Sequence, residues 1–143
     1  MLYKPSRDQA RQFLIESWHK RRNKLPATAL ETLAADIVEW HREYHPLLAA
    51  TDAATREWTP EQGETNPFLH LSLHLAIEEQ LSIDQPPGIR KALDQLVQRT
   101  GDRHAALHKV LECLGETMWR AQRDNKPLDG DVYLECIQRS AAC

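Results

Sequence analysis

Apolar residues recur every three or four positions along most of the chain, which is the spacing of amphipathic helices. The five glycines and eight prolines divide the chain into segments of helical length. The pattern predicts an all-α fold, a helical bundle of about six helices that forms a single domain over residues 1–143. The predicted helices cover residues 7–22, 29–44, 67–83, 89–100, 103–124 and 130–140.

Capping signals mark the starts of these helices. Ser6 precedes the first helix, and Thr28 with Glu31 has the spacing of a capping box before the second. Asn66-Pro67 supplies an N-cap and a first helical residue for the third helix. Asp102 is the expected N-cap of the fifth helix.

Prolines and glycines mark the helix ends. Pro46 disfavours helix at His45, so the second helix is expected to end near Tyr44. Residues 46–65 are expected to form a long connection with one short turn. Gly101 follows the fourth helix, at the position where a left-handed residue commonly ends a helix.

Composition and charge narrow the class of protein. The chain has 143 residues, with 18 basic and 21 acidic side chains and a formal charge of -3. This near-neutral balance argues against binding to nucleic acid or to anionic membranes. No apolar run is long enough to cross a membrane, and the opening MLYKPSRDQA lacks the apolar region of a signal peptide. We therefore expect a soluble, cytoplasmic protein.

The cysteines are Cys113, Cys136 and Cys143, and they form no Cys-x-x-Cys motif. An odd number without that motif does not suit a disulfide scaffold or a thiolate zinc finger. We expect reduced cysteines. Cys113, on the opposite side of its helix from the histidines described next, is expected to contribute to packing or to a second interface rather than to bind metal.

The seven histidines of the chain are arranged rather than scattered. Six of them form three His-x3-His pairs, whose spacing brings both side chains onto one helix face; chance predicts about 0.3 such pairs. Two of the pairs continue to a glutamate four residues later, where chance predicts about 0.03 triplets at this spacing. The sets are His41 with His45, His70 with His74 and Glu78, and His104 with His108 and Glu112.

A helical projection at about 100° per residue places all three pairs within the apolar, core-facing arcs. Buried polar side chains need partners. Two imidazoles one turn apart can chelate a metal ion, and a carboxylate one turn further can reach a second ion or form a bridge. A core hydrogen bond explains a single histidine such as His41 better than metal ligation does, and it explains His70 or His104 alone equally well. The two triplets together favour metal ligation. The predicted ligands are His41, His45, His70, His74, Glu78, His104, His108 and Glu112.

The two triplets suggest a specific arrangement. If the helices over 67–83 and 103–124 pack antiparallel, His70 lies near Glu112 and His104 lies near Glu78. Each of two ions would then take a histidine pair from one helix and a carboxylate from the other. The metal site would occupy the core of the bundle.

Two resemblances accompany these patterns. The stretch from Asn66 to Arg90, the opening Pro5–Gln9 and the segment Glu112–Glu116 resemble a bacterial family catalogued as a domain of unknown function. The ligand inventory of six histidines with Glu78 and Glu112 is similar to that of haemerythrin-like proteins. Those proteins hold two irons in a helical bundle through imidazoles and bridging carboxylates, so the resemblance implies shared ligand chemistry, although the ligand order differs.

These features predict a metal-binding helical protein with a dinuclear His/Glu site. We expect two metal ions, with iron favoured and zinc or manganese as alternatives, and a site that binds, senses or reacts with dioxygen or a related small molecule. The alternative is a zinc-braced or metal-free helical adaptor that acts through protein–protein contacts. No candidate nucleophile is visible, so no catalytic activity is assigned. We expect no nucleic-acid or membrane partner, and the sequence is compatible with a homodimer.

Overall fold

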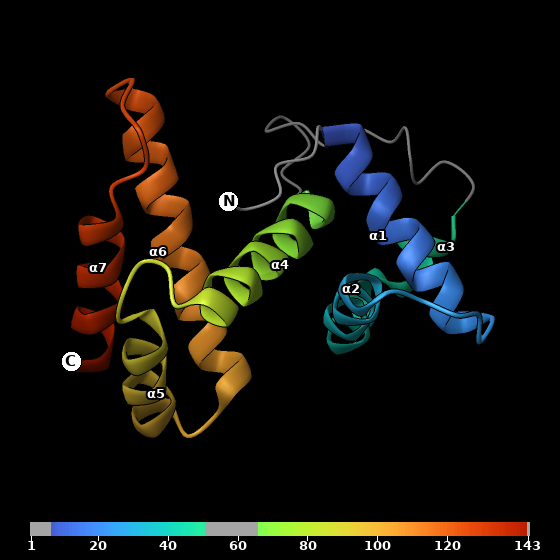
Figure 1. Ribbon diagram of the computed structural model, residues 1–143, viewed down its shortest axis with the longest axis horizontal. Coiled ribbons are helices and arrows are strands. Elements are labelled where there is room, and N and C mark those ends of the chain that lie inside the picture. The colour runs from blue at the N-terminus through green and yellow to red at the C-terminus, as the bar shows by residue number, and fades with distance from the viewer. Residues whose placement is uncertain (1–6, 51–65, 143) are drawn as a thin grey trace. The chain divides into compact units, whose positions relative to one another are not determined.

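A computed structural model describes residues 7–50 and 66–142 of the chain (Figure 1). Within these ranges it contains seven α-helices, one short 3₁₀ helix and no strand, so the predicted all-α bundle fold is confirmed. The elements are α1 (Arg7–Arg22), α2 (Ala29–Trp40), η1 (Arg42–Tyr44), α3 (His45–Ala49), α4 (Pro67–Ile83), α5 (Ile89–Thr100), α6 (Arg103–Arg123) and α7 (Gly130–Ala142). None of the helices in the described ranges is long and apolar enough to cross a membrane.

The chain divides into two compact units, Met1–Leu75 and Ala76–Cys143. Helix α4 begins in the first unit and ends in the second. The single domain over residues 1–143 stays a prediction. The predicted Ser6 cap, most of the 46–65 connection and Cys143 fall outside the described residues.

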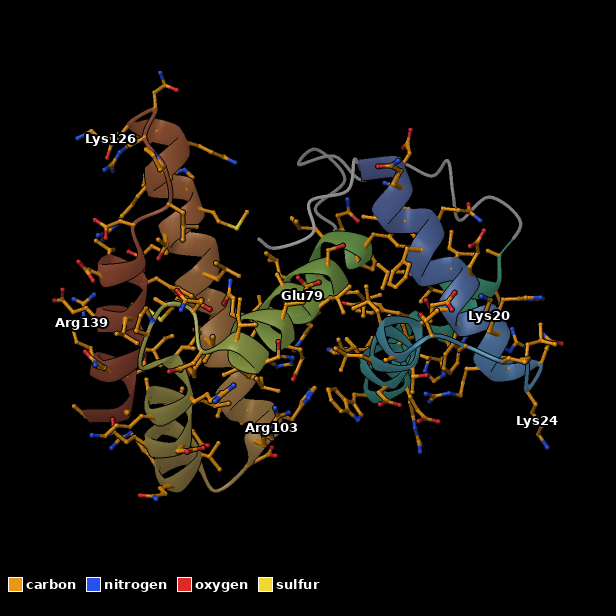
Figure 2. The ribbon with its side chains drawn as sticks, viewed as in Figure 1. Lys20, Lys24, Glu79, Arg103, Lys126 and Arg139 are labelled. Atoms are coloured by element: carbon orange, nitrogen blue, oxygen red, sulfur yellow. A yellow bond between two sulfur atoms is a disulfide. The ribbon has the colours of Figure 1, made fainter. Side chains whose placement is uncertain are left out.

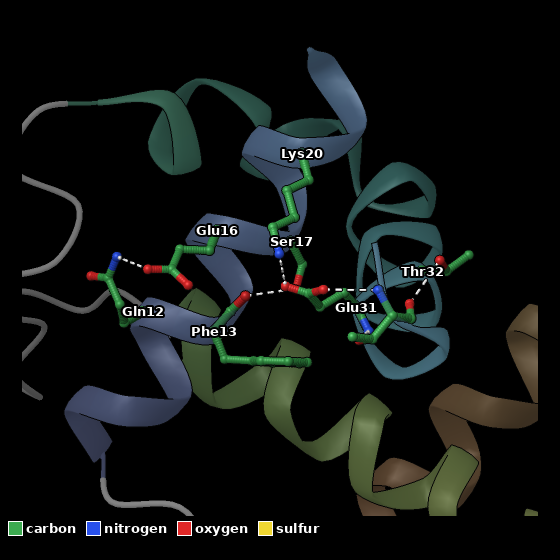
Figure 3. A network of polar contacts seen from close by, with 8 residues as sticks. Gln12, Phe13, Glu16, Ser17, Lys20, Glu31 and Thr32 are labelled. Atoms are coloured by element: carbon green, nitrogen blue, oxygen red, sulfur yellow. Dashed lines mark hydrogen bonds and ion pairs between the residues drawn. The ribbon is translucent and has the colours of Figure 1, made fainter. Parts of the chain in front are cut away.

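In the first unit, α1, α2, α3 and the beginning of α4 pack around one apolar core. Its buried members are Leu14, Trp18, Ala34, Ala35, Ile37, Val38, Leu48, Phe68 and Leu71. An ion pair joins α1 to α2, because Lys20 Nζ lies 2.6 Å from Glu31 Oε2 (Figure 3). The same Glu31 accepts a hydrogen bond from the backbone N–H of Thr28, so it both caps α2 and anchors α1.

In the second unit, α5, α6 and α7 pack side by side (Figure 1). The buried residues of α6 are Ala106, Leu107, Val110, Cys113, Leu114 and Thr117. A buried hydrogen bond ties α7 to the end of α4, because the Tyr133 hydroxyl donates to Gln80 Oε1 at 2.6 Å. This polar pair lies inside an otherwise apolar core and specifies how the two helices meet.

The predicted caps are present. Thr28 and Glu31 form both hydrogen bonds of the capping box. Asn66 Oδ1 accepts from the N–H of Phe68 at 2.9 Å, and Asp102 Oδ1 accepts from the N–H of His104 at 3.1 Å. Gly101 has a φ of 73° and ends α5 in the left-handed conformation.

The prediction around residue 45 is wrong in two respects. Helix α2 ends at Trp40 rather than near Tyr44, and a 3₁₀ turn separates it from α3. His45 is helical, with a φ of -58° and a ψ of -45°, although Pro46 follows it. Proline is tolerated here because it lies in the first turn of α3, where no intrahelical acceptor is needed for its missing N–H.

The expectation that all cysteines are reduced is also wrong. Cys113 of α6 and Cys136 of α7 form a disulfide across these two packed helices, with Cα atoms 5.7 Å apart. Cys113 is part of the buried face of α6, as the packing role predicted for it requires. Because the two cysteines are 23 residues apart in sequence, only the antiparallel return of the chain through the turn after α6 brings them together.

Candidate metal centre

His41 is the C-cap residue of α2. Its side chain forms a hydrogen bond with the backbone of the last turn of the same helix. His41 Nδ1 lies 2.7 Å from the backbone oxygen of Ile37. A carbonyl oxygen can only accept, so Nδ1 carries the proton and the neutral ring presents its Nε2 lone pair at the other end. A backbone carbonyl in this position is the support that metal-ligating histidines commonly have.

His70 and His74 lie one turn apart in the first half of α4, and both face His41. His70 Nε2 is 3.2 Å from His41 Nε2, and the ring centroids of His41 and His74 are 4.7 Å apart. One ring nitrogen of each of the three histidines lies within 4.8 Å of the other two. We call this set the three-histidine group.

The spacing of these nitrogens fits a metal ion. A tetrahedral ion with bonds of 2.0–2.1 Å to nitrogen places its ligand atoms about 3.3 Å apart. The His41–His70 separation of 3.2 Å already matches this edge. Nitrogens 4.8 Å apart would each need to move by roughly 0.7 Å to reach it. Small rotations of the imidazoles therefore suffice.

The predicted pair His41 and His45 is separated by the 3₁₀ turn. His45 Nε2 donates to the backbone oxygen of Val38 at 2.9 Å, and its ring packs on Trp18 with centroids 4.4 Å apart. One ring nitrogen of His45 thus bonds to the backbone of α2, as in His41, but His45 is not among the histidines whose ring nitrogens converge. His45 stabilises the local structure rather than joining the three-histidine group.

Tyr44 borders the group, although it was not among the predicted site residues. Its ring stacks on His41 at 5.7 Å and meets His70 edge-on at 6.0 Å. Burial, and next the negative charge of Glu43, raise the pKa of the Tyr44 hydroxyl above its ordinary value of 10.0. At neutral pH the side chain therefore stays uncharged. Its place three residues after His41 was the only sequence signal for this contact.

The second histidine pair lies on α6. The rings of His104 and His108 are 4.3 Å apart, as the four-residue spacing predicts. The buried stripe of α6 runs through residues such as Leu107, Val110 and Leu114, and it is centred well away from the line of the histidines. Both histidines are half-buried and the Nε2 atom of His108 is buried, so the pair lies beside the buried stripe rather than at its centre.

Both predicted carboxylates contact cationic side chains in the second unit. Glu78 is mostly buried and binds Arg103 through both oxygens, at 3.2 and 3.3 Å. Arg103 directly precedes His104, so the start of α6 does lie beside Glu78, but a guanidinium occupies the carboxylate. Glu112 has a side chain that is 69% exposed and that lies 3.6 Å from Lys109. Its predicted place on the core face is wrong, because the buried stripe of α6 lies on another side.

A family model described as a domain of unknown function, DUF1841, matches residues 6–139. The chain belongs to this family. A search of curated proteins and a search of solved structures found no match. The family description assigns no activity, so the proposals for this DUF1841 protein rest on its own residues.

The structure of this DUF1841 protein brings some of the eight predicted ligands together and gives others different contacts. His41, His70 and His74 come together and could hold a metal ion. His45, Glu78 and Glu112 make other contacts. His104 and His108 form their own ring pair in the second unit, and their part in metal binding stays a prediction.

Proposed function

We propose that this protein binds a transition-metal ion through His41, His70 and His74, and that the ion's remaining position takes a small molecule. The observation that carries the proposal is the orientation of His41. Its Nδ1–H is fixed on the Ile37 carbonyl, which directs the Nε2 lone pair toward His70 and leaves it no tautomeric freedom.

The donor set indicates the class of metal. Neutral imidazoles suit zinc, iron, copper and nickel, whereas magnesium, calcium and manganese prefer carboxylate and water oxygens. A site with three protein ligands keeps a fourth position for water or a substrate molecule, whereas a site with four protein ligands is closed. The proposed small-molecule binding requires the first case. Dioxygen or a related small molecule at an iron ion is the version of this function that the sequence pattern favours.

One ion is better supported than two. The predicted dinuclear centre needs carboxylates as bridges, but Glu78 is engaged by Arg103 and Glu112 is largely exposed. Both would have to leave their present partners to bridge two ions. The metal-to-protein ratio separates the two cases directly.

The contact between His41 and His70 indicates what metal binding would change at the site. Without metal, His41 Nε2 accepts a hydrogen bond from His70 Nε2–H, since His41 Nδ1 already holds the proton of its own ring. Metal binding requires His70 to lose or relocate that proton. Affinity should therefore fall as the pH is lowered, because metal binding releases protons.

The test is a metal-binding titration of the full chain, purified without a histidine tag, together with elemental analysis. Cobalt(II) and iron(II) serve as spectroscopic probes and zinc(II) as a competitor. His41→Ala and His74→Ala should each lower affinity by at least about 100-fold, since loss of a ligand costs more than loss of its outer partner. His45→Ala is the matched control, because it removes a nearby histidine whose Nε2 is bonded to Val38.

Equal affinity in His41→Ala, His45→Ala and the unaltered protein would overturn the proposal, as would purified protein with no metal and no uptake. His19→Ala, at an exposed position, should also bind normally. His104→Ala and His108→Ala in the same titration test the predicted ligand role of the second pair. Two irons per chain would restore the dinuclear prediction, and one ion per chain supports the mononuclear site.

A further inference from the structure

The second unit has a basic pocket that is lined in part by Cys136 of the disulfide. None of the described residues that line it belongs to the three-histidine group. The pocket has a volume of about 510 Å³. The described residues that line it are Arg99, Lys109, Cys136, Arg139 and Ser140. Three different helices contribute its cations, since Arg99 lies in the last turn of α5, Lys109 lies on α6 and Arg139 lies on α7. Figure 2 labels Arg139 on α7.

The charge of this pocket is poorly compensated. Among the described residues, Arg99 and Arg139 have no carboxylate partner in an ion pair. Lys109 has only the exposed i,i+3 contact with Glu112 at 3.6 Å, and such exposed pairs contribute little. None of the lining residues within the described ranges is acidic. Three positive charges around one concavity concentrate anions there.

The first unit also has a pocket lined by cations, but two of those cations form short ion pairs. This pocket is lined by Lys20, Arg21 and Lys24 among others. Lys20 lies 2.6 Å from Glu31, and Arg21 lies 2.7 Å from Asp36. Lys20 and Arg21 of α1 thus pair with carboxylates of α2 and join the two helices. The cations of the α5–α6–α7 pocket make no comparable contact.

The two sulfurs of the disulfide differ in access. Cys113 is 3% exposed, whereas Cys136 is half-buried and lines the pocket. Thiol–disulfide exchange depends on which sulfur a thiolate can reach. A thiol held in the pocket therefore meets Cys136 Sγ first, and Cys113 is the leaving group.

We infer that this pocket binds small anionic thiols and directs their exchange with the Cys113–Cys136 disulfide. A thiolate whose other end carries a carboxylate or sulfonate attacks Cys136 Sγ. The Cys113–Cys136 bond breaks, a mixed disulfide forms at Cys136, and Cys113 leaves as a thiolate that takes up a proton. A second thiolate attacks the mixed disulfide and releases the small molecule as its own disulfide and Cys136 as a thiol. Two thiols are oxidised and the protein disulfide is reduced.

The test compares three thiols of similar size: 2-mercaptoethanesulfonate, 2-mercaptoethanol and cysteamine, which are anionic, neutral and cationic at the far end. The full chain with Cys143→Ser removes the third thiol of the sequence. Rates of disulfide reduction are expressed per concentration of thiolate and are corrected for the dependence of thiolate nucleophilicity on thiol pKa. At low ionic strength the anionic thiol should react about tenfold faster than the neutral one, and the cationic thiol should be slowest. High salt should remove the difference.

Variants locate the effect. Arg99→Gln with Arg139→Gln should lower the anionic-to-neutral rate ratio toward one. The rate with 2-mercaptoethanol should fall by less, because its thiolate carries one negative charge rather than two. Circular dichroism checks that the variant is folded. Arg120→Gln is the matched control, because Arg120 lies on α6 outside the pocket and pairs with Glu116 at 2.8 Å. Peptide mapping should find the adduct on Cys136.

Three results would overturn the inference. The first is an equal rate for anionic and neutral thiols in the unaltered pocket at low salt. The second is an undiminished preference in the Arg99/Arg139 double variant. The third is an adduct on Cys113, or free thiols at Cys113 and Cys136 in protein kept under oxidising conditions. None of these measurements depends on whether the three-histidine group binds metal.

Discussion

The hydrogen bond between Tyr133 and Gln80 gives a sharp test of how the second unit is held together. Tyr133 is 0% exposed and Gln80 is 8% exposed, and their side-chain oxygens are 2.6 Å apart. Tyr133→Phe removes only the hydroxyl and keeps the ring in the core. The loss leaves the Gln80 oxygen buried with its partner gone, which costs about 1–3 kcal/mol of unfolding free energy.

Urea unfolding measures this loss, with amide exchange by mass spectrometry to assign it to α4 and α7. With a slope of about 2 kcal/mol/M, the midpoint of the affected transition should fall by roughly 0.5–1.5 M at unchanged slope. Gln80→Leu in the Tyr133→Phe background should recover much of the stability, since removing both partners avoids the unsatisfied group. A shift within measurement error for Tyr133→Phe alone would refute the reasoning.

The stability of the protein at alkaline pH gives a second test of the role of the Tyr133 hydroxyl. Burial raises the pKa of Tyr133 far above its ordinary value of 10.0. The unfolded chain therefore loses the tyrosine proton above about pH 10 while the folded chain keeps it, so stability falls as the pH rises. Tyr133→Phe should show a smaller alkaline loss than the unaltered protein. Parallel profiles for the two proteins would contradict the assignment.

Two further outcomes follow from local features of the second unit. Cys113→Ala with Cys136→Ala removes the crosslink between residues that are 23 positions apart in sequence. The loss should lower the unfolding free energy by about 3 kcal/mol in a denaturant titration. If the variant and the unaltered protein have the same unfolding free energy and respond equally to reductant, the crosslink is absent in solution. Asp84 accepts hydrogen bonds from the N–H groups of Arg90 and Gly88, which lower the pKa of its carboxyl below 3.8. The stability that Asp84 contributes is therefore present above about pH 4 and is lost as the pH falls through the lowered pKa. The difference between the unaltered protein and Asp84→Asn should shrink over that range, and a difference independent of pH would contradict it.

The sequence by itself determined the helices and most of their ends. A capping box, an N-cap or a C-terminal glycine acts within one helical turn, so Thr28 with Glu31, Asn66, Asp102 and Gly101 could be assigned from neighbours a few positions away. The same local rule failed at His45, where a proline that usually precedes a break instead lies in the first turn of a new helix.

The histidine spacing likewise determined which side chains share a helix face, but not what they meet. His70 and His74 lie together because four residues make about one turn. That His41 completes their group while His45 does not was decided by the 3₁₀ turn after Trp40 and by two backbone carbonyls. A backbone acceptor leaves no mark in the sequence, so the pattern alone could not distinguish the two histidines.

Only the tertiary structure decided the contacts between distant segments. Glu78 pairs with Arg103, Glu112 remains exposed, and Cys113 bonds to Cys136. Each outcome depends on which face of α6 is buried, and that face is chosen by packing against α5 and α7 rather than by the periodicity of α6 alone. Helical periodicity fixes the relative angles of residues around one helix, whereas the side that turns inward depends on the neighbours that cover it.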